Sequence, residues 1–96
     1  MANTFNKFMV YIYNGMLEEA KAFYINHPAI YISANNEQAF RLACEYGHLE
    51  VAKWLFEIKP DINISAGNES AFRSACEHGH LNIVEWLLKI KPDINI

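Results

Sequence analysis

Three histidines and two cysteines are the residues of this chain with the most obvious capacity for chemistry. Cys44 and His48 are spaced Cys-x3-His, and Cys76, His78 and His80 are spaced Cys-x-His-x-His. Structural zinc sites usually place a Cys-x2–4-Cys pair before a His-x3–5-His pair, and neither spacing here matches that arrangement. We therefore expect no metal site and no cofactor.

Nucleophilic catalysis by a cysteine–histidine pair is also disfavoured. Phe72, Ala75 and Cys76 follow the spacing of one helical stripe, as do their counterparts around Cys44. A thiol buried on such a stripe stays protonated and unreactive. The chain has no Gly-rich phosphate loop, no serine-centred elbow and no His-Glu-x-x-His helix. We expect no enzyme and no small-molecule substrate, and two unpaired buried thiols favour an intracellular, cytoplasmic location.

Composition and charge narrow the classes of partner. The chain has 96 residues, a hydrophobic fraction of 52% and a net charge of −3, with Lys and Arg spread along it. The absence of a basic block argues against nucleic-acid binding. The longest apolar run, 8–13, is far shorter than the roughly 20 residues of a membrane span. No signal-peptide pattern is present, so we expect no membrane partner.

The cysteines and histidines recur because the chain repeats with a period of 32 residues. Laying 33–64 over 65–96 leaves only 10 differences in 32 positions, and 1–32 is a weaker copy. A period of this length predicts stacked helix pairs that bury their apolar faces against one another. We therefore expect a single domain over 1–96, with 1–32 as a divergent N-terminal capping repeat followed by repeats 33–64 and 65–96.

The pattern inside one repeat predicts a turn, a short helix, a tight loop, a longer helix and an extended arm. In the last copy, Gly and Asn at 65–68 suit a turn, and Gly79 is a natural helix end. Pro92 ends the second helix, and 93–96 alternate as an extended arm would. We expect His80 to hydrogen-bond local backbone and Trp86 to pack between neighbouring repeats, and we expect the same of His48 and Trp54 one period earlier.

These motifs resemble the ankyrin repeat. The matching residues are Gly79-His80-Leu81, Ile83-Val84, Leu87-Leu88 and Asp93-Ile94-Asn95, with the same set one period earlier. The resemblance implies an all-α, helix-turn-helix solenoid of three stacked repeats that acts as a non-catalytic protein-interaction module. The family's Thr-Pro-Leu-His opening reads Gln38-Ala39-Phe40-Arg41 here, so its Thr–His hydrogen bonds are not implied.

This variant also looks like the ankyrin-repeat proteins of large DNA viruses that infect amoebae. That likeness implies a host protein as the partner and the host-cell cytoplasm as the location. Residues 65–96 have the pattern of an interior repeat, so we expect either a longer array or a last repeat that docks another chain.

The positions that differ between the two close copies predict where a partner binds. The pairs 38/70, 42/74 and 46/78 are four residues apart, so they share one face of the first helix, and 35/67 lies in the preceding turn. The resemblance implies the same location. Neutral drift on a solvated face, or a role as a structural spacer in a longer array, are the alternatives. The predicted partner-binding residues are Asn35, Gln38, Leu42, Glu45, Tyr46, Gly67, Ser70, Ser74, Glu77 and His78.

Overall fold

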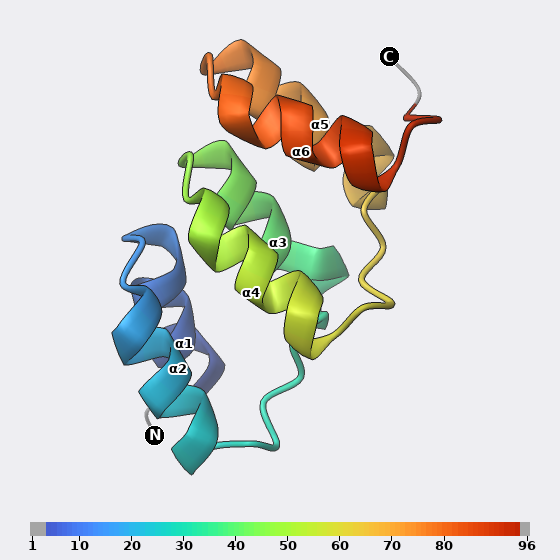
Figure 1. The fold of residues 1–96 in the computed structure, drawn as a ribbon. Helices are drawn as coiled ribbons and strands as arrows, with labels where there is room; N and C mark the ends of the chain where they lie inside the picture. The colour runs from blue at the N-terminus through green and yellow to red at the C-terminus, as the bar shows by residue number, and fades with distance from the viewer. Residues whose placement is uncertain (1–3, 95–96) are drawn as a thin grey trace.

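The computed structural model describes residues 4–94, and all regular structure within that range is helical. Figure 1 shows three helix pairs side by side, with α2, α4 and α6 in front of α1, α3 and α5. The stack is elongated, with extents of 40 × 22 × 21 Å. None of the described helices is long and apolar enough to cross a membrane. The helices are α1 (Thr4–Tyr13), α2 (Leu17–Asn26), α3 (Ala34–Glu45), α4 (Leu49–Ile58), α5 (Ala66–Glu77) and α6 (Leu81–Ile90).

Each pair is closed by a tight loop that ends the first helix at a glycine, as the sequence predicts. Gly47 has φ 79°, and its N–H donates to the carbonyl oxygen of Cys44 at 3.2 Å. The N–H of His48 donates to the carbonyl oxygen of Ala43 at 2.8 Å. These two bonds form a Schellman motif, which requires the left-handed conformation that glycine adopts most easily. The same pattern recurs at Gly15 and Gly79.

The segment after each second helix is a turn, and the prediction of an extended arm over 93–96 is wrong at Asp93, which lies in the turn. The N–H of Ile94 donates to the carbonyl oxygen of Lys91 at 3.3 Å, and Ile62 does the same to Lys59 at 3.1 Å. The turn directs the isoleucine into the core, where Ile94 is 6% exposed. Burial of this side chain therefore overrides the alternating pattern. Asn95 and Ile96 lie outside the described residues.

The core lies between the helix pairs, where α1 packs against α3 and α3 against α5. Trp54 of α4 contacts Phe8 of α1, with ring centroids 6.1 Å apart. One pair further on, Trp86 of α6 lies 6.0 Å from Phe40. Both tryptophans thus pack on the preceding helix pair, which confirms the prediction for them. The largest fully buried side chains are Phe8, Phe40, Ile12, Leu55, Ile83, Leu87, Val51 and Cys44.

The first helices of the second and third pairs begin with an unusual left-handed turn. Asn35, Asn36 and Glu37 have φ values of 57°, 59° and 64°, so the right-handed part of α3 starts only at Gln38. Gly67, Asn68 and Glu69 repeat this in α5. The prediction of a turn at 65–68 is confirmed at Gly67 and Asn68, which both have positive φ. The glutamates are unexpected, because this conformation costs an ordinary residue roughly 1–2 kcal/mol.

Candidate protein-interaction surface

An arginine in the same helix pair holds each left-handed turn in place. Arg41 Nε–H donates to the carbonyl oxygen of Asn36 at 2.9 Å, and its Nη2–H donates to that of Asn35 at 3.2 Å. Arg73 binds the equivalent carbonyls at 3.0 and 3.4 Å. The planar guanidinium can hold two acceptors at once, which a lysine does less well. Arg41 and Arg73 thus stabilise the turn tips that precede them in the chain.

A buried carboxylate joins each turn tip to the segment beyond its own pair. Glu37 is 6% exposed, and its Oε2 accepts the N–H of Asn63 at 2.8 Å. Asn63 lies in the connection between α4 and α5, so this bond fixes the path of the chain into the next pair. Glu69 is equally buried, with its Oε2 3.8 Å from Lys91 Nζ. Neither glutamate is among the residues predicted from the sequence, although an identical acid in both copies of a turn was the available signal.

None of the ten predicted partner-binding residues is buried, and they line the turn tips and the first helices α3 and α5. Leu42 differs in character from the others, because it packs partly against the hydrophobic core. Asn35 Nδ2–H donates to Gln38 Oε1 at 3.0 Å, which couples the turn to the first helical residue. Their role in binding stays a prediction. Exposed are Asn35, Tyr46, Gly67, Glu77 and His78, and half-buried are Gln38, Leu42, Glu45, Ser70 and Ser74.

Aromatic rings gather where the first helices end. Tyr46 lies 6.2 Å from Tyr13 of α1, ring centroid to centroid, and the two side chains remain 51% and 39% exposed. In the third pair His78 and His80 are stacked with centroids 6.0 Å apart. This edge of the stack therefore offers exposed rings from all three pairs. Comparing copies could not reveal Tyr13, because the first copy diverges there.

The loop histidines link neighbouring helix pairs, and the prediction that they bond local backbone is wrong. His48 Nε2–H donates to the carbonyl oxygen of Tyr13 at 2.9 Å. His80 Nε2–H donates to that of Glu45 at 3.0 Å. Each acceptor is a last-turn carbonyl of the preceding first helix, which has no partner within its own helix. The bond is thus made between pairs because that is where an acceptor is free.

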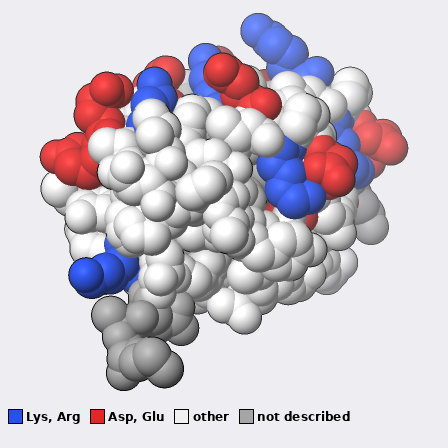
Figure 2. Space-filling model, turned by 90° about the horizontal axis from the view of Figure 1, so that it is seen from below, with Lys and Arg blue, Asp and Glu red and all other residues white. Residues whose placement is uncertain are grey.

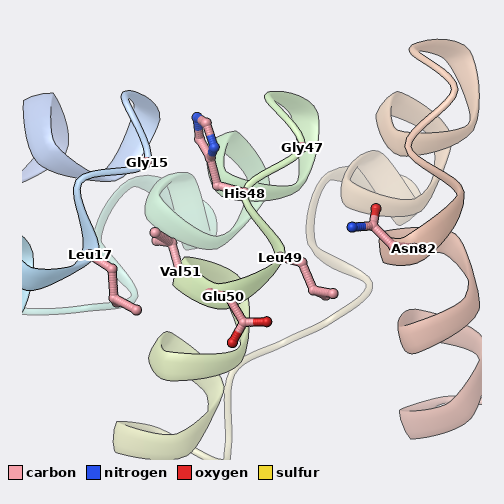
Figure 3. Close-up of a pocket in the computed structure, with 8 residues that line it drawn as sticks. All are labelled: Gly15, Leu17, Gly47, His48, Leu49, Glu50, Val51 and Asn82. Atoms are coloured by element: carbon pink, nitrogen blue, oxygen red, sulfur yellow. The ribbon is translucent and has the colours of Figure 1, made fainter.

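The hollow beside the first of these histidines has no catalytic arrangement. It measures about 340 Å³ and is open to solvent. Figure 3 shows His48 between the loops of Gly15 and Gly47, with the carboxylate of Glu50 pointing away from the ring. Nε2 of His48 is already hydrogen-bonded to Tyr13, and no cysteine or serine lines the hollow. Within residues 4–94, no three His, Cys, Asp or Glu side chains are close enough to hold a metal ion.

The two cysteines differ in environment, which corrects the prediction that both are buried. Cys44 is fully buried in α3, and this burial raises the pKa of its thiol far above the ordinary value. Cys76 occupies the same place in α5 but is exposed. The third helix pair covers the former, and within the described residues no helix pair covers the latter. Neither thiol forms a disulfide.

Charged side chains do not form a continuous basic patch on the face shown in Figure 2. There, Lys, Arg, Asp and Glu lie along the upper margin, at the sides and in a mixed group just right of the centre, with both signs interspersed, whereas a broad area left of the centre carries neither sign. On this face the mixed charges form no continuous basic track of the kind that follows a phosphate backbone.

The described geometry agrees with what comparison with known proteins finds. A family model described as ankyrin repeats (3 copies) matches residues 8–96, which include most of α1 and all five other helices. Comparison with curated proteins gives no significant match, and comparison with solved structures gives none either. The family match does not bear on the source of the chain, so the likeness to viral repeats stays a prediction.

Proposed function

The chain belongs to the ankyrin-repeat family, whose members are generally non-catalytic protein-interaction modules, and we propose that it binds a partner protein through the turn tips and first helices of its second and third pairs. The binding surface consists of the ten predicted partner-binding residues, joined by Tyr13. The partner is another protein, and it is a host protein in the host cytoplasm if the chain is viral. No nucleic acid, membrane or small-molecule substrate takes part.

One observation carries this proposal: the two close copies differ at surface positions of a turn and helix whose backbone is held fixed. The hydrogen bonds of Arg41 and Glu37 stabilise a strained turn. Meanwhile Gln38 becomes Ser70 and Tyr46 becomes His78 one period later. A rigid support with variable side chains is how binding surfaces achieve affinity without a large ordering cost.

The divergent first copy fits the role of a cap in this arrangement. Phe5 and Met9 stand where the later copies have Glu37 and Arg41. The first copy therefore lacks the two side chains that hold the left-handed turn in the later copies. Within this proposal, 1–32 closes the core, and 33–64 and 65–96 supply most of the binding residues.

The test exchanges surface residues between copies, so that every introduced residue already occurs at the matching position of the native fold. Asn35→Gly, Gln38→Ser and Tyr46→His give the second turn and helix the residues of the third at three of the four differing positions. Leu42 is kept because it packs partly against the hydrophobic core. The control, Lys53→Glu with Glu57→Lys, makes the matching exchange on the exposed face of α4. Partners would be captured quantitatively from the cells that express the protein, for wild type and both variants.

We expect the first exchange to lose a defined partner and the control to retain it, with both variants folded by circular dichroism. Equal recovery of every partner by all three proteins would contradict the binding proposal. It would favour the alternative of a structural spacer, for which only the stacking of the pairs matters.

A further inference from the structure

The third helix pair exposes a face that the second pair covers with its neighbour. Cys44 is fully buried under the third pair, whereas Cys76 at the same position is exposed. Arg41 is half-buried and Arg73 exposed, and Ala52 is buried where Val84 is half-buried. These three differences have the same direction. They mark a surface on α5 and α6 that has the composition of an interface between pairs.

Gly79 lies on this face at the position where a loop histidine packs in the first two pairs, but here no histidine lies against it. Gly15 and Gly47 each lie against an imidazole of the following pair, so that an added Cβ would be within 2.7 Å of its ring atoms. At Gly79 the same added Cβ would meet no atom within 4 Å. The backbone conformation is unchanged, with φ 72° at Gly79 and 79° at Gly47. The third pair therefore already has the backbone conformation that accepts a loop histidine in the other two pairs.

An apolar hollow lies where a tryptophan would pack. Trp54 covers Phe8, and Trp86 covers Phe40. The equivalent Phe72 borders an open hollow of about 400 Å³, lined by Phe72, Arg73, Cys76 and Glu77. Its volume suits one large aromatic side chain with its immediate neighbours.

The backbone leaves α6 as it leaves α4, in the direction of a following pair. Lys59 and Lys91 both have φ −143° and ψ 80°, and the turns after them share the same hydrogen bond. A second copy of this chain stacked head to tail would place its first pair against this face, and that pair lacks the histidine and the tryptophan. Met16 and Ala22 stand at the places of His48 and Trp54 in the first copy.

From these matched contacts, we propose that the exposed face of α5 and α6 is a docking site for one further ankyrin-type helix pair. That unit carries a histidine in its loop and a tryptophan in its second helix. The histidine bonds the carbonyl oxygen of Glu77 above Gly79, and the tryptophan packs on Phe72. This inference concerns a different surface from the partner-binding residues and does not depend on them.

Cys76 is the reporter for the test. A copy of 65–96 is fused after Ile96, with its own cysteine replaced by serine so that Cys76 remains the one exposed thiol. We expect Cys76 in the fused protein to react with a disulfide reagent such as DTNB at least tenfold more slowly than in the native chain. Hydrogen exchange of α5 and α6 should slow in parallel.

A matched fusion tests whether the histidine and the tryptophan are needed for docking. In it the residues equivalent to His80 and Trp86 are methionine and alanine, as at Met16 and Ala22 of the first copy. This fusion should leave Cys76 nearly as reactive as in the native chain. Equal protection by both fusions, or protection by neither, would overturn the proposal. Protection of Cys76 in the unfused chain that grows with its concentration, together with dimers in sedimentation, would overturn it in favour of a second copy.

Discussion

The imidazole of His80 lies directly against Gly47, where an added Cβ atom would be 2.7 Å from the ring atoms Nδ1 and Cε1. Gly47 also ends α3 in the left-handed conformation, with φ 79°. This glycine therefore meets two requirements at once, one from its own helix and one from the following pair. Gly79 meets only the first, because nothing lies within 4 Å of its added Cβ.

Gly47→Ala and Gly79→Ala should separate these two requirements. Both substitutions place a Cβ in the left-handed region, at a cost of about 1–2 kcal/mol each. Gly47→Ala must also displace the His80 ring, and overpacking of this kind costs about 1–3 kcal/mol more. Urea unfolding should therefore show the larger loss of stability for Gly47→Ala. The double variant Gly47→Ala, His80→Ala should recover part of the difference, and equal losses in the two single variants would show that the ring moves away freely.

Glu37→Ala should destabilise the protein much more than the exposed control Glu50→Ala. The substitution leaves the N–H of Asn63 without its acceptor, which costs about 1–3 kcal/mol at a partly buried site. Glu37→Gly loses the same bond but relieves the strain of φ 64°, so its cost should be lower by about 1 kcal/mol. Chemical denaturation of the three variants tests this order. A Glu37→Gly variant no more stable than Glu37→Ala would contradict the strained turn.

Much of the fold is predictable because its determinants are local and occur twice. Gly47 and Gly79 end helices through their own backbone freedom, and Trp54 and Trp86 fall on apolar stripes of helical period. Such features need no knowledge of the neighbouring pair. The turn ending at Ile94 was mispredicted because burial of its side chain, a tertiary effect, decides the backbone path there.

The candidate surface was less predictable, since its supports act across helix pairs. Glu37 is buried and accepts a hydrogen bond from Asn63, 26 positions further along the chain, and no local sequence pattern indicates that contact. The histidine at 48 reads as a local cap, yet its partner is the carbonyl oxygen of Tyr13, 35 positions away. Cys76 was expected to be buried like Cys44, because period alone does not say which faces are covered.

Burial of Cys44 should make stability depend on pH in the alkaline range. Its pKa is raised in the folded protein, whereas in the unfolded chain a thiol has its ordinary pKa of about 8.5. Above that pH the unfolded chain releases the proton and the folded protein keeps it, so the free energy of unfolding falls as pH rises. The slope from this residue approaches about 1.4 kcal/mol per pH unit.

Unfolding measured between pH 7.5 and pH 10 would test this dependence. Cys44→Ala should show a shallower loss of stability than wild type, whereas the control Cys76→Ala leaves the buried Cys44 in place and should keep the wild-type loss. In the native protein at neutral pH, one thiol should react quickly with DTNB and the second only after denaturation. Identical pH profiles for all three proteins would show that Cys44 is not desolvated as described.

Arg41→Lys should loosen the turn tip of the second pair while leaving the helices intact. A lysine ammonium is a flexible point charge and does not hold both carbonyl oxygens, those of Asn35 and Asn36, as the planar guanidinium does. We expect a loss of about 1 kcal/mol, the net value of a typical hydrogen bond, and faster hydrogen exchange at residues 35–37. Lys53→Arg on the exposed face of α4 is the control.

Because Asn35 is hydrogen-bonded to Gln38, a loosened turn should also weaken binding of any partner that contacts them, without removing a contacting side chain. Unchanged exchange at 35–37 would mean that the turn is held by the backbone alone, and that the arginine has another role.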